Sequence, residues 1–202
     1  MIRAARSVYR RRLRRYAYLR HLLSGKPPAP FDCAFVIGQN KTGTTSMARF
    51  LEACGLRHLS INEHVRARYH REGMAYLDRL ARHFHSFDDL PWNRLEVIEH
   101  FMSQDRDFRF ILTTRDPDAW FDSWVRFQRK RQRTPPPEAD RARLTDGLRS
   151  RDAHCRLLAA RFARPLLELD LERDADAAKR VAAFLSLDPA AVPPMPHANR
   201  TR

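Results

Sequence analysis

The apolar residues of this chain gather in short runs, which are separated by longer stretches of mixed spacing. Three runs, at 31–38, 108–114 and 165–171, are rich in β-forming or apolar residues and are bounded by glycine, proline or charged residues. Such runs predict buried β-strands. Each run precedes a stretch in which apolar residues recur at helical intervals. We expect these helices at 44–54, 119–131 and 175–185.

Two more helices are expected between the first and second strands. One covers 64–84, and the other runs from Pro91 to about Gln104, because proline suits the first turn of a helix. Asp118 is placed to cap the helix that starts at Ala119. Strands that alternate with helices predict an α/β fold, in which a central parallel sheet lies between two layers of helices.

The two ends of the chain depart from this pattern. Residues 1–23 mix arginines with apolar residues at helical spacing, which predicts a basic amphipathic helix, and a proline-rich linker follows. The chain therefore divides into an arm at 1–30 and an α/β domain at 31–202. Prolines also mark an irregular excursion at 132–140 and a tail at 188–202.

Composition and charge narrow the class of protein. With 43% hydrophobic and 31% charged residues, the chain has the composition of a soluble globular protein. Its net charge of +14 invites a nucleic-acid interpretation, but nine basic residues and no acid lie within 1–26, which leaves only +5 for the rest. Arginine supplies 34 of the 38 basic residues, a bias that base composition explains as well as phosphate binding does. We therefore expect no nucleic-acid partner.

The sequence shows neither a membrane span nor a secretory signal. No stretch approaches 18 consecutive apolar residues, and arginines stand where a signal needs an apolar segment. We expect a cytoplasmic protein whose residues 1–23 either touch an anionic membrane surface or pack on the domain. Three widely spaced cysteines predict reduced thiols, and the nine histidines show no zinc-ligand spacing.

A glycine loop follows the first predicted strand. Gly38 and Gly43 bracket the loop, and Thr44 opens the next helix. Backbone N–H groups of such a loop converge on phosphate or sulfate oxygens, although the same residues also make ordinary turns and caps. The glycine spacing matches the nucleotide-triphosphate loop, but Thr44 occupies the lysine position and Lys41 lies two residues before the second glycine. This order argues against triphosphate hydrolysis, and Lys41 can meet charge that develops on a leaving phosphate oxygen.

The second predicted strand carries another motif. Residues 111–123 form a strand, a loop and the start of a helix, with Arg115 at the strand end and Ser123 about two turns into the helix. At this spacing the guanidinium and the hydroxyl can both face one phosphate. Together with the loop order KxGTT, this motif resembles the phosphosulfate-binding and 3′-phosphate-binding motifs of the sulfotransferases. The resemblance covers roughly 31–187.

The resemblance implies a three-layer fold like that of P-loop NTPases. It also implies the donor 3′-phosphoadenosine 5′-phosphosulfate (PAPS), which leaves as 3′-phosphoadenosine 5′-phosphate (PAP), with Lys41 stabilising the leaving phosphate and no metal required. The donor would then be held by Lys41, Thr42, Gly43, Thr44, Thr45, Ser46, Arg115 and Ser123. The tail lacks the GxxGxWK segment of the cytosolic animal enzymes, so Arg200 or Asn199 is the candidate to cover the adenine, unless the tail only docks on the surface.

The base that takes the acceptor proton is left open between two carboxylates. Family members use a histidine or a glutamate, and we rank Asp89 and Glu63 equally, ahead of His100 and His64. Asp89 also suits a helix cap before Pro91, and Glu63 suits the acidic first turn of a helix. A carboxylate serves as this base only where its surroundings adjust its pKa.

The resemblance implies transfer of a sulfuryl group to a hydroxyl, with a small molecule, carbohydrate or lipid as the acceptor. Acceptor pockets come from variable loops, which we expect at 62–76, 83–92 and 126–152. Two other functions stay open. An atypical P-loop nucleotide kinase would bind Mg-ATP instead of PAP. A basic module that binds nucleic acid or membrane without catalysis would lose binding in salt and on deletion of residues 1–26.

Overall fold

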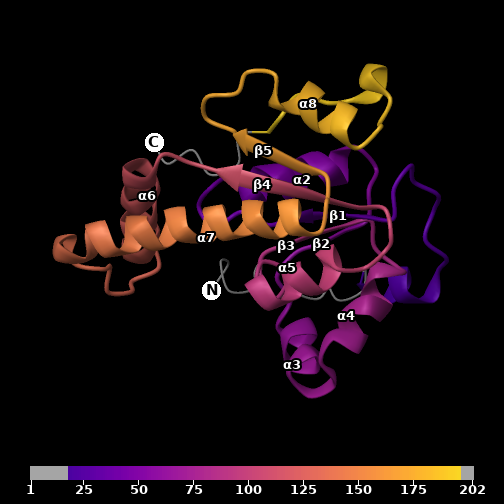
Figure 1. Ribbon diagram of the computed structural model, residues 1–202, viewed down its shortest axis with the longest axis horizontal. Coiled ribbons are helices and arrows are strands. Elements are labelled where there is room, and N and C mark those ends of the chain that lie inside the picture. Colours follow the sequence, from indigo (N-terminus) through magenta and orange to yellow (C-terminus); the bar gives the residue numbers. More distant parts are fainter. Residues whose placement is uncertain (1–17, 197–202) are drawn as a thin grey trace, which may run out of the picture.

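Five parallel strands form the central sheet of the computed structural model, which describes residues 18–196 (Figure 1). The strands are β1 (Cys33–Val36), β2 (His58–Leu59), β3 (Ser86–Asp88), β4 (Phe108–Thr114) and β5 (Leu166–Asp170). Their order is β2-β3-β1-β4-β5, so the chain leaves the central β1 to one side for β2 and β3 and then crosses to the other. In an open parallel sheet, ligands bind beyond the carboxyl ends of strands at such a change of direction.

Helices cover both faces of the sheet. They are α2 (Thr44–Ala53), α3 (Glu63–Glu72), α4 (Met74–Ala81), α5 (Leu95–Met102), α6 (Pro117–Lys130), α7 (Arg141–Arg161) and α8 (Ala177–Phe184), with short 3-10 turns η1 (Glu138–Asp140) and η2 (Pro189–Ala191). Successive side chains of β1 point to opposite faces. Phe35 therefore packs in a core with residues of α4, α5 and α7, and Val36 packs with α2 and α8. The expected three-layer α/β fold is confirmed.

The three long strands lie where the apolar runs predict them, but the sheet has two more. β2 has two residues and β3 has three, and neither stands out as an apolar run. Ser86 and Asp88 are polar, yet both are buried, because a hydrogen-bonded cluster with His58 satisfies them. Burial of polar groups in this way removes the sequence pattern on which strand prediction depends.

Several predicted helix boundaries are wrong. The helix expected at 64–84 is broken at Gly73, which has φ 65° and separates α3 from α4. α5 begins at Leu95, and the chain makes turns from Pro91 up to that point, so Pro91 does not open a helix. The cap of α6 is Asp116 rather than Asp118, because Asp116 Oδ1 accepts the N–H of residue 119 at 3.0 Å.

The segment expected to be irregular, 132–140, is irregular apart from η1, and a helix that the sequence pattern did not predict follows it. α7 has 21 residues, and it runs along one face of the sheet and beyond the sheet to α6 (Figure 1). Its buried side chains include both polar and apolar residues, so the amphipathic pattern is weak. Trp120 and Phe121 of α6 bury their rings against Leu148 of α7. Only the connection between these helices is irregular, apart from η1.

The arm and the tail are described only in part. Residues 18–23 are helical and pack on the domain through Tyr18, which is 4% exposed and shares a 2.6 Å hydrogen bond with the Tyr76 hydroxyl. The predictions for the rest of the arm, and for Asn199 and Arg200 in the tail, lie outside the described residues. Within residues 18–196, no helix is both long and apolar enough to cross a membrane.

Candidate functional site

The glycine loop lies at the carboxyl end of β1, where the strand order changes direction. Gly38 cannot be replaced, because a Cβ at this position would lie 1.9 Å from Thr113 Oγ1 on β4. Thr42 fixes the other side of the loop: its hydroxyl lies 2.6 Å from the Gln39 carbonyl oxygen and 2.7 Å from Thr113 Oγ1. The loop is therefore held against β4, the strand that leads to the second motif.

The loop ends at the N-terminus of α2. Gly43 has φ 103°, a left-handed conformation that suits glycine, and no side chain caps the helix after it. The first turn of α2 contains no acidic residue. Its backbone N–H groups and the positive end of the helix dipole therefore make a favourable position for an anion. Thr44 and Ser46 are buried in this turn, and Thr45 is exposed.

Helix α6 packs one face against the loop. The Trp120 indole N–H donates to the Asn40 carbonyl at 2.8 Å, and the Lys41 ammonium lies 3.7 Å from the centre of the Phe127 ring. Ser123 is three residues after Trp120 and four residues before Phe127. It therefore lies on the same side of the helix as these two rings. The structure thus brings Lys41 and the Ser123 side of α6 together.

Lys41 lies among other cations. Partial burial is the main cause that lowers the pKa of its ammonium, and Arg131, Arg115 and Lys130 lower it further. The backbone at Lys41 is left-handed, with φ 74°. This group of basic side chains favours an anionic ligand at the loop.

Arg115 joins the two motifs directly. Its Nη1 donates to the Lys41 carbonyl at 3.1 Å, and its Nη2 lies 2.5 Å from Glu172 Oε1 in the segment after β5. The third nitrogen, Nε, is buried and has no hydrogen-bond partner within residues 18–196. A buried donor without a partner is costly, so a ligand acceptor would complete this arginine.

Asp89 follows β3, the strand next to β1, and therefore lies at the same edge of the sheet as the loop. Its backbone is left-handed, with φ 59°, and its carboxylate accepts the N–H of Leu90 at 2.8 Å. Burial is the main cause that raises the pKa of Asp89, the neighbouring Asp88 raises it further, and Arg66 opposes the shift. Since α5 starts only at Leu95, Asp89 is not its cap.

A cavity of about 500 Å³ lies between the loop and Asp89. Its walls combine the loop, the turn after β3, the start of α5 and the middle of α7. The lining residues are Gln39, Asn40, Asp89, Leu90, Asn93, Arg94, Leu95, Glu96 and Arg151. Two of the three segments expected to form the acceptor pocket, 83–92 and 126–152, contribute to these walls. Residues of the third, 62–76, line a smaller groove of about 290 Å³ that also includes Arg94.

The other candidate bases lie apart from this cavity. Glu63 is exposed in the first turn of α3 and is not among the lining residues. His100 lies on α5 with Nε2 2.8 Å from Asp78 Oδ1, and the His64 ring contacts Tyr18 edge-on. Of the two carboxylates that the sequence ranks equally as the base, only Asp89 lines the cavity.

Several residues of the site escaped the sequence analysis. Trp120 and Phe127 lie at helical spacing from Ser123, a signal that could have identified them once that face of α6 was assigned to the loop. Glu172 and Arg151 have no such signal. Each reaches the site only through the packing of β5 and α7 against the rest of the domain.

Fold and site together define an α/β protein that has a glycine loop with basic neighbours at the carboxyl edge of its parallel sheet. A family model described as a sulfotransferase domain matches residues 34–182, well over half of the chain. The chain therefore belongs to the sulfotransferase family and is a transferase of sulfuryl groups. No curated protein matches the chain. Within residues 18–196, no group of three or more histidine, cysteine or acidic side chains is arranged to hold a metal ion.

Proposed function

We propose that this protein transfers the sulfuryl group of PAPS to a hydroxyl of an acceptor bound in the cavity beside Asp89. The observation that carries the proposal is the position of this cavity. It shares Gln39 and Asn40 with the glycine loop and has the partly buried Asp89 carboxylate in its wall. Donor and acceptor would therefore meet between Lys41 and Asp89.

The residues around the loop fit the donor. Residues 42–46 offer backbone N–H groups for the 5′-phosphosulfate, and Thr44, Thr45 and Ser46 add hydroxyls, at the start of a helix whose first turn contains no acidic residue. Arg115 has an unpartnered buried Nε, and Ser123 lies on the side of α6 that faces the loop. These two side chains are the proposed ligands of the 3′-phosphate.

The chemistry follows from these positions. The acceptor hydroxyl oxygen attacks the sulfur, the bond between sulfur and the 5′-phosphate oxygen breaks, and the hydroxyl proton passes to Asp89. Lys41 stabilises the charge that the leaving phosphate gains. Its raised pKa makes Asp89 a stronger base than an ordinary aspartate.

The walls of the cavity favour a polar acceptor. Apart from Leu90 and Leu95, the lining residues carry amide, carboxylate or guanidinium groups. A volume of about 500 Å³ lies within the range of small-molecule pockets. The sugar unit of a glycan or glycolipid suits this cavity better than an acyl chain does.

Calorimetric titration with PAP tests the donor site, with Mg-ATP as the competing ligand. We expect micromolar binding of PAP without magnesium, and a loss of about tenfold or more in Arg115→Ala, the scale of charge-assisted hydrogen bonds. Arg173→Ala is the matched control, because Arg173 is exposed and lies 3.8 Å from both Asp116 and Asp170. Preference for Mg-ATP would instead favour the kinase, and binding of neither nucleotide would contradict the proposal.

A further inference from the structure

Arg151 is a charged residue of the cavity to which neither motif assigns a role. It lies midway along α7, and its side chain is only 12% exposed. Its Nη2 donates to two carbonyl oxygens, that of Ile37 at 2.8 Å and that of Asn93 at 2.7 Å. One guanidinium nitrogen thus ties the end of β1, just before the glycine loop, to the turn that follows Asp89.

The other terminal nitrogen of Arg151 has no hydrogen-bond partner in the part of the chain that the structure describes. Nη1 is buried and makes no hydrogen bond within residues 18–196. The carboxylate of Asp152 is 3.7 Å away, beyond hydrogen-bond distance, and its Oδ1 likewise has no hydrogen bond within these residues. Burial of a charged guanidinium costs free energy unless an anion forms a hydrogen bond with it.

The two bonds of Nη2 fix where the guanidinium can act. They hold the group rigidly in the wall of a cavity that also includes Asn40 and Asp89. A fixed guanidinium loses little entropy on binding, and its geometry suits the oxygens of sulfate, phosphate or carboxylate. Arg94 also lines the cavity, but it is more exposed and is already paired with Glu96.

We propose that Arg151 binds an anionic oxygen of a substrate through Nη1 and is a further binding residue of the transfer site. The inference rests on the proposed function. The anionic oxygen belongs either to the sulfuryl group that is being transferred or to an acidic group on the acceptor, since both enter the same cavity. In either position Arg151 supplies a donor from α7, which lies on the face of the sheet opposite α2.

The test compares Arg151→Gln with Arg149→Gln. Arg149 is the matched control, because it lies on the same helix, is exposed and pairs only with Asp146 among the described residues. PAP titration of wild type comes first. Absence of PAP binding in wild type would contradict the proposed function itself, whereas normal PAP binding in wild type and both variants leaves the role of Arg151 as the only question.

Two readouts then distinguish the sources of the anion. The first is slow transfer from PAPS to water, which yields PAP and sulfate and needs no acceptor. The second is binding of glucuronate relative to glucose by the PAP-saturated protein. If the guanidinium meets the sulfuryl group, Arg151→Gln slows transfer to water by about tenfold or more. If it meets an acidic acceptor, transfer to water is unchanged, and a preference of about tenfold for glucuronate is lost.

Equal behaviour of Arg151→Gln and Arg149→Gln in both readouts would overturn the inference. Because Arg151 also holds two backbone carbonyls, its substitution can disturb folding, and wild type provides a test without any variant. Inorganic sulfate should bind to the PAP-saturated wild type, or glucuronate should bind it more tightly than glucose does. Failure of both probes would reject an anion-binding role for Arg151.

Discussion

At the scale of single residues, the two groups to which we assign the chemistry share an unusual backbone conformation. Lys41 has φ 74° and Asp89 has φ 59°, and both follow strands at the carboxyl edge of the sheet. Left-handed conformations are unfavourable for residues with a Cβ, and they persist where the surroundings fix them, often at functional sites. Here the conformation belongs to the turns that carry both side chains to the cavity and the loop.

The titration of these two residues predicts the pH dependence of turnover. Asp89 must be ionised to accept a proton, so its raised pKa moves the acidic limb of the profile above that of an ordinary aspartate. Lys41 must be charged, so its lowered pKa moves the alkaline limb of the profile to lower pH.

Asp89→Asn should lower kcat by about a hundredfold or more with PAP affinity kept, as expected for loss of a general base.

Glu63→Gln is the matched control for that measurement, because it replaces the exposed carboxylate that the sequence ranked equally. We expect its pH–rate profile and kcat to match those of wild type. The assignment of the base to Asp89 would be wrong if the glutamine variant lost turnover and the asparagine variant kept it.

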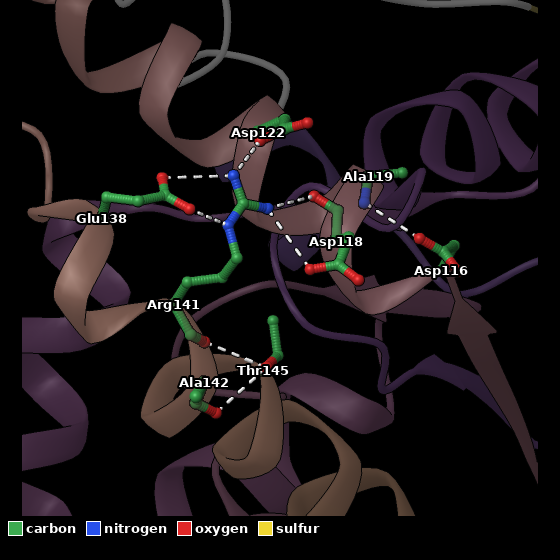
Figure 2. Close-up of polar contacts among 8 residues, drawn as sticks. All are labelled: Asp116, Asp118, Ala119, Asp122, Glu138, Arg141, Ala142 and Thr145. Atoms are coloured by element: carbon green, nitrogen blue, oxygen red, sulfur yellow. Dashed lines mark hydrogen bonds and ion pairs between the residues drawn. The ribbon is translucent and has the colours of Figure 1, made fainter.

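At the scale of elements, the donor side of the site depends on how α6 is held against α7. Figure 2 shows the Arg141 guanidinium, at the start of α7, among the carboxylates of Asp118, Asp122 and Glu138. Its Nη2 lies 2.8 Å from Asp122 Oδ1, and its Nη1 lies 3.3 Å from Asp118 Oδ1. It also lies over the ring of Phe121 at 4.4 Å. This arginine therefore joins η1 and α7 to the first turns of α6.

Arg141→Ala should loosen this junction. We expect a melting temperature lower by a few degrees and weaker PAP binding by severalfold, because α6 carries Ser123 and the aromatic rings that meet the loop. Arg143→Ala is the control, since Arg143 is more exposed and pairs only with Asp140 among the described residues. Thermal unfolding and PAP titration measure both effects, and equal results for the two variants would show that the junction does not support the site.

At the scale of the whole molecule, stability is coupled to pH through a buried acid on α7. Burial raises the pKa of Asp152 to about 6, with Glu168 adding to the shift and Arg151 and Arg156 opposing it. Between about pH 4 and 6 the unfolded chain releases this proton while the folded protein keeps it. The free energy of unfolding therefore falls as pH rises through this window, by about 3 kcal/mol for a shift of about two pKa units.

Asp152→Asn removes that dependence. Relative to wild type, the free energy of unfolding of this variant should increase between pH 4 and pH 7, by up to about 3 kcal/mol. Urea unfolding at the two pH values measures the difference. Asp146→Asn, on the exposed side of the same helix, should show little change. A difference between Asp152→Asn and wild type that stayed constant with pH would contradict the raised pKa.

The features that are contiguous in the chain could be predicted from local sequence patterns. The strand before Gly38, the loop to Gly43 and the helix after it are set by local apolar spacing, backbone conformation and hydrogen bonds within a few residues. The same holds for the strand, loop and helix that carry Arg115 and Ser123. Local patterns suffice here, because the residues that make each motif are neighbours.

Which distant residues lie beside the glycine loop followed from the packing of strands and helices. Asp89 lies beside the loop because β3 pairs with β1. The sequence did not predict this position, since β3 is too short and too polar to be recognised as a strand. Arg151 reaches the cavity because α7 packs beside the sheet, and its weak amphipathic pattern hid that helix. Such contacts follow from strand order and packing between segments far apart in sequence, which the periodicity of any one segment does not record.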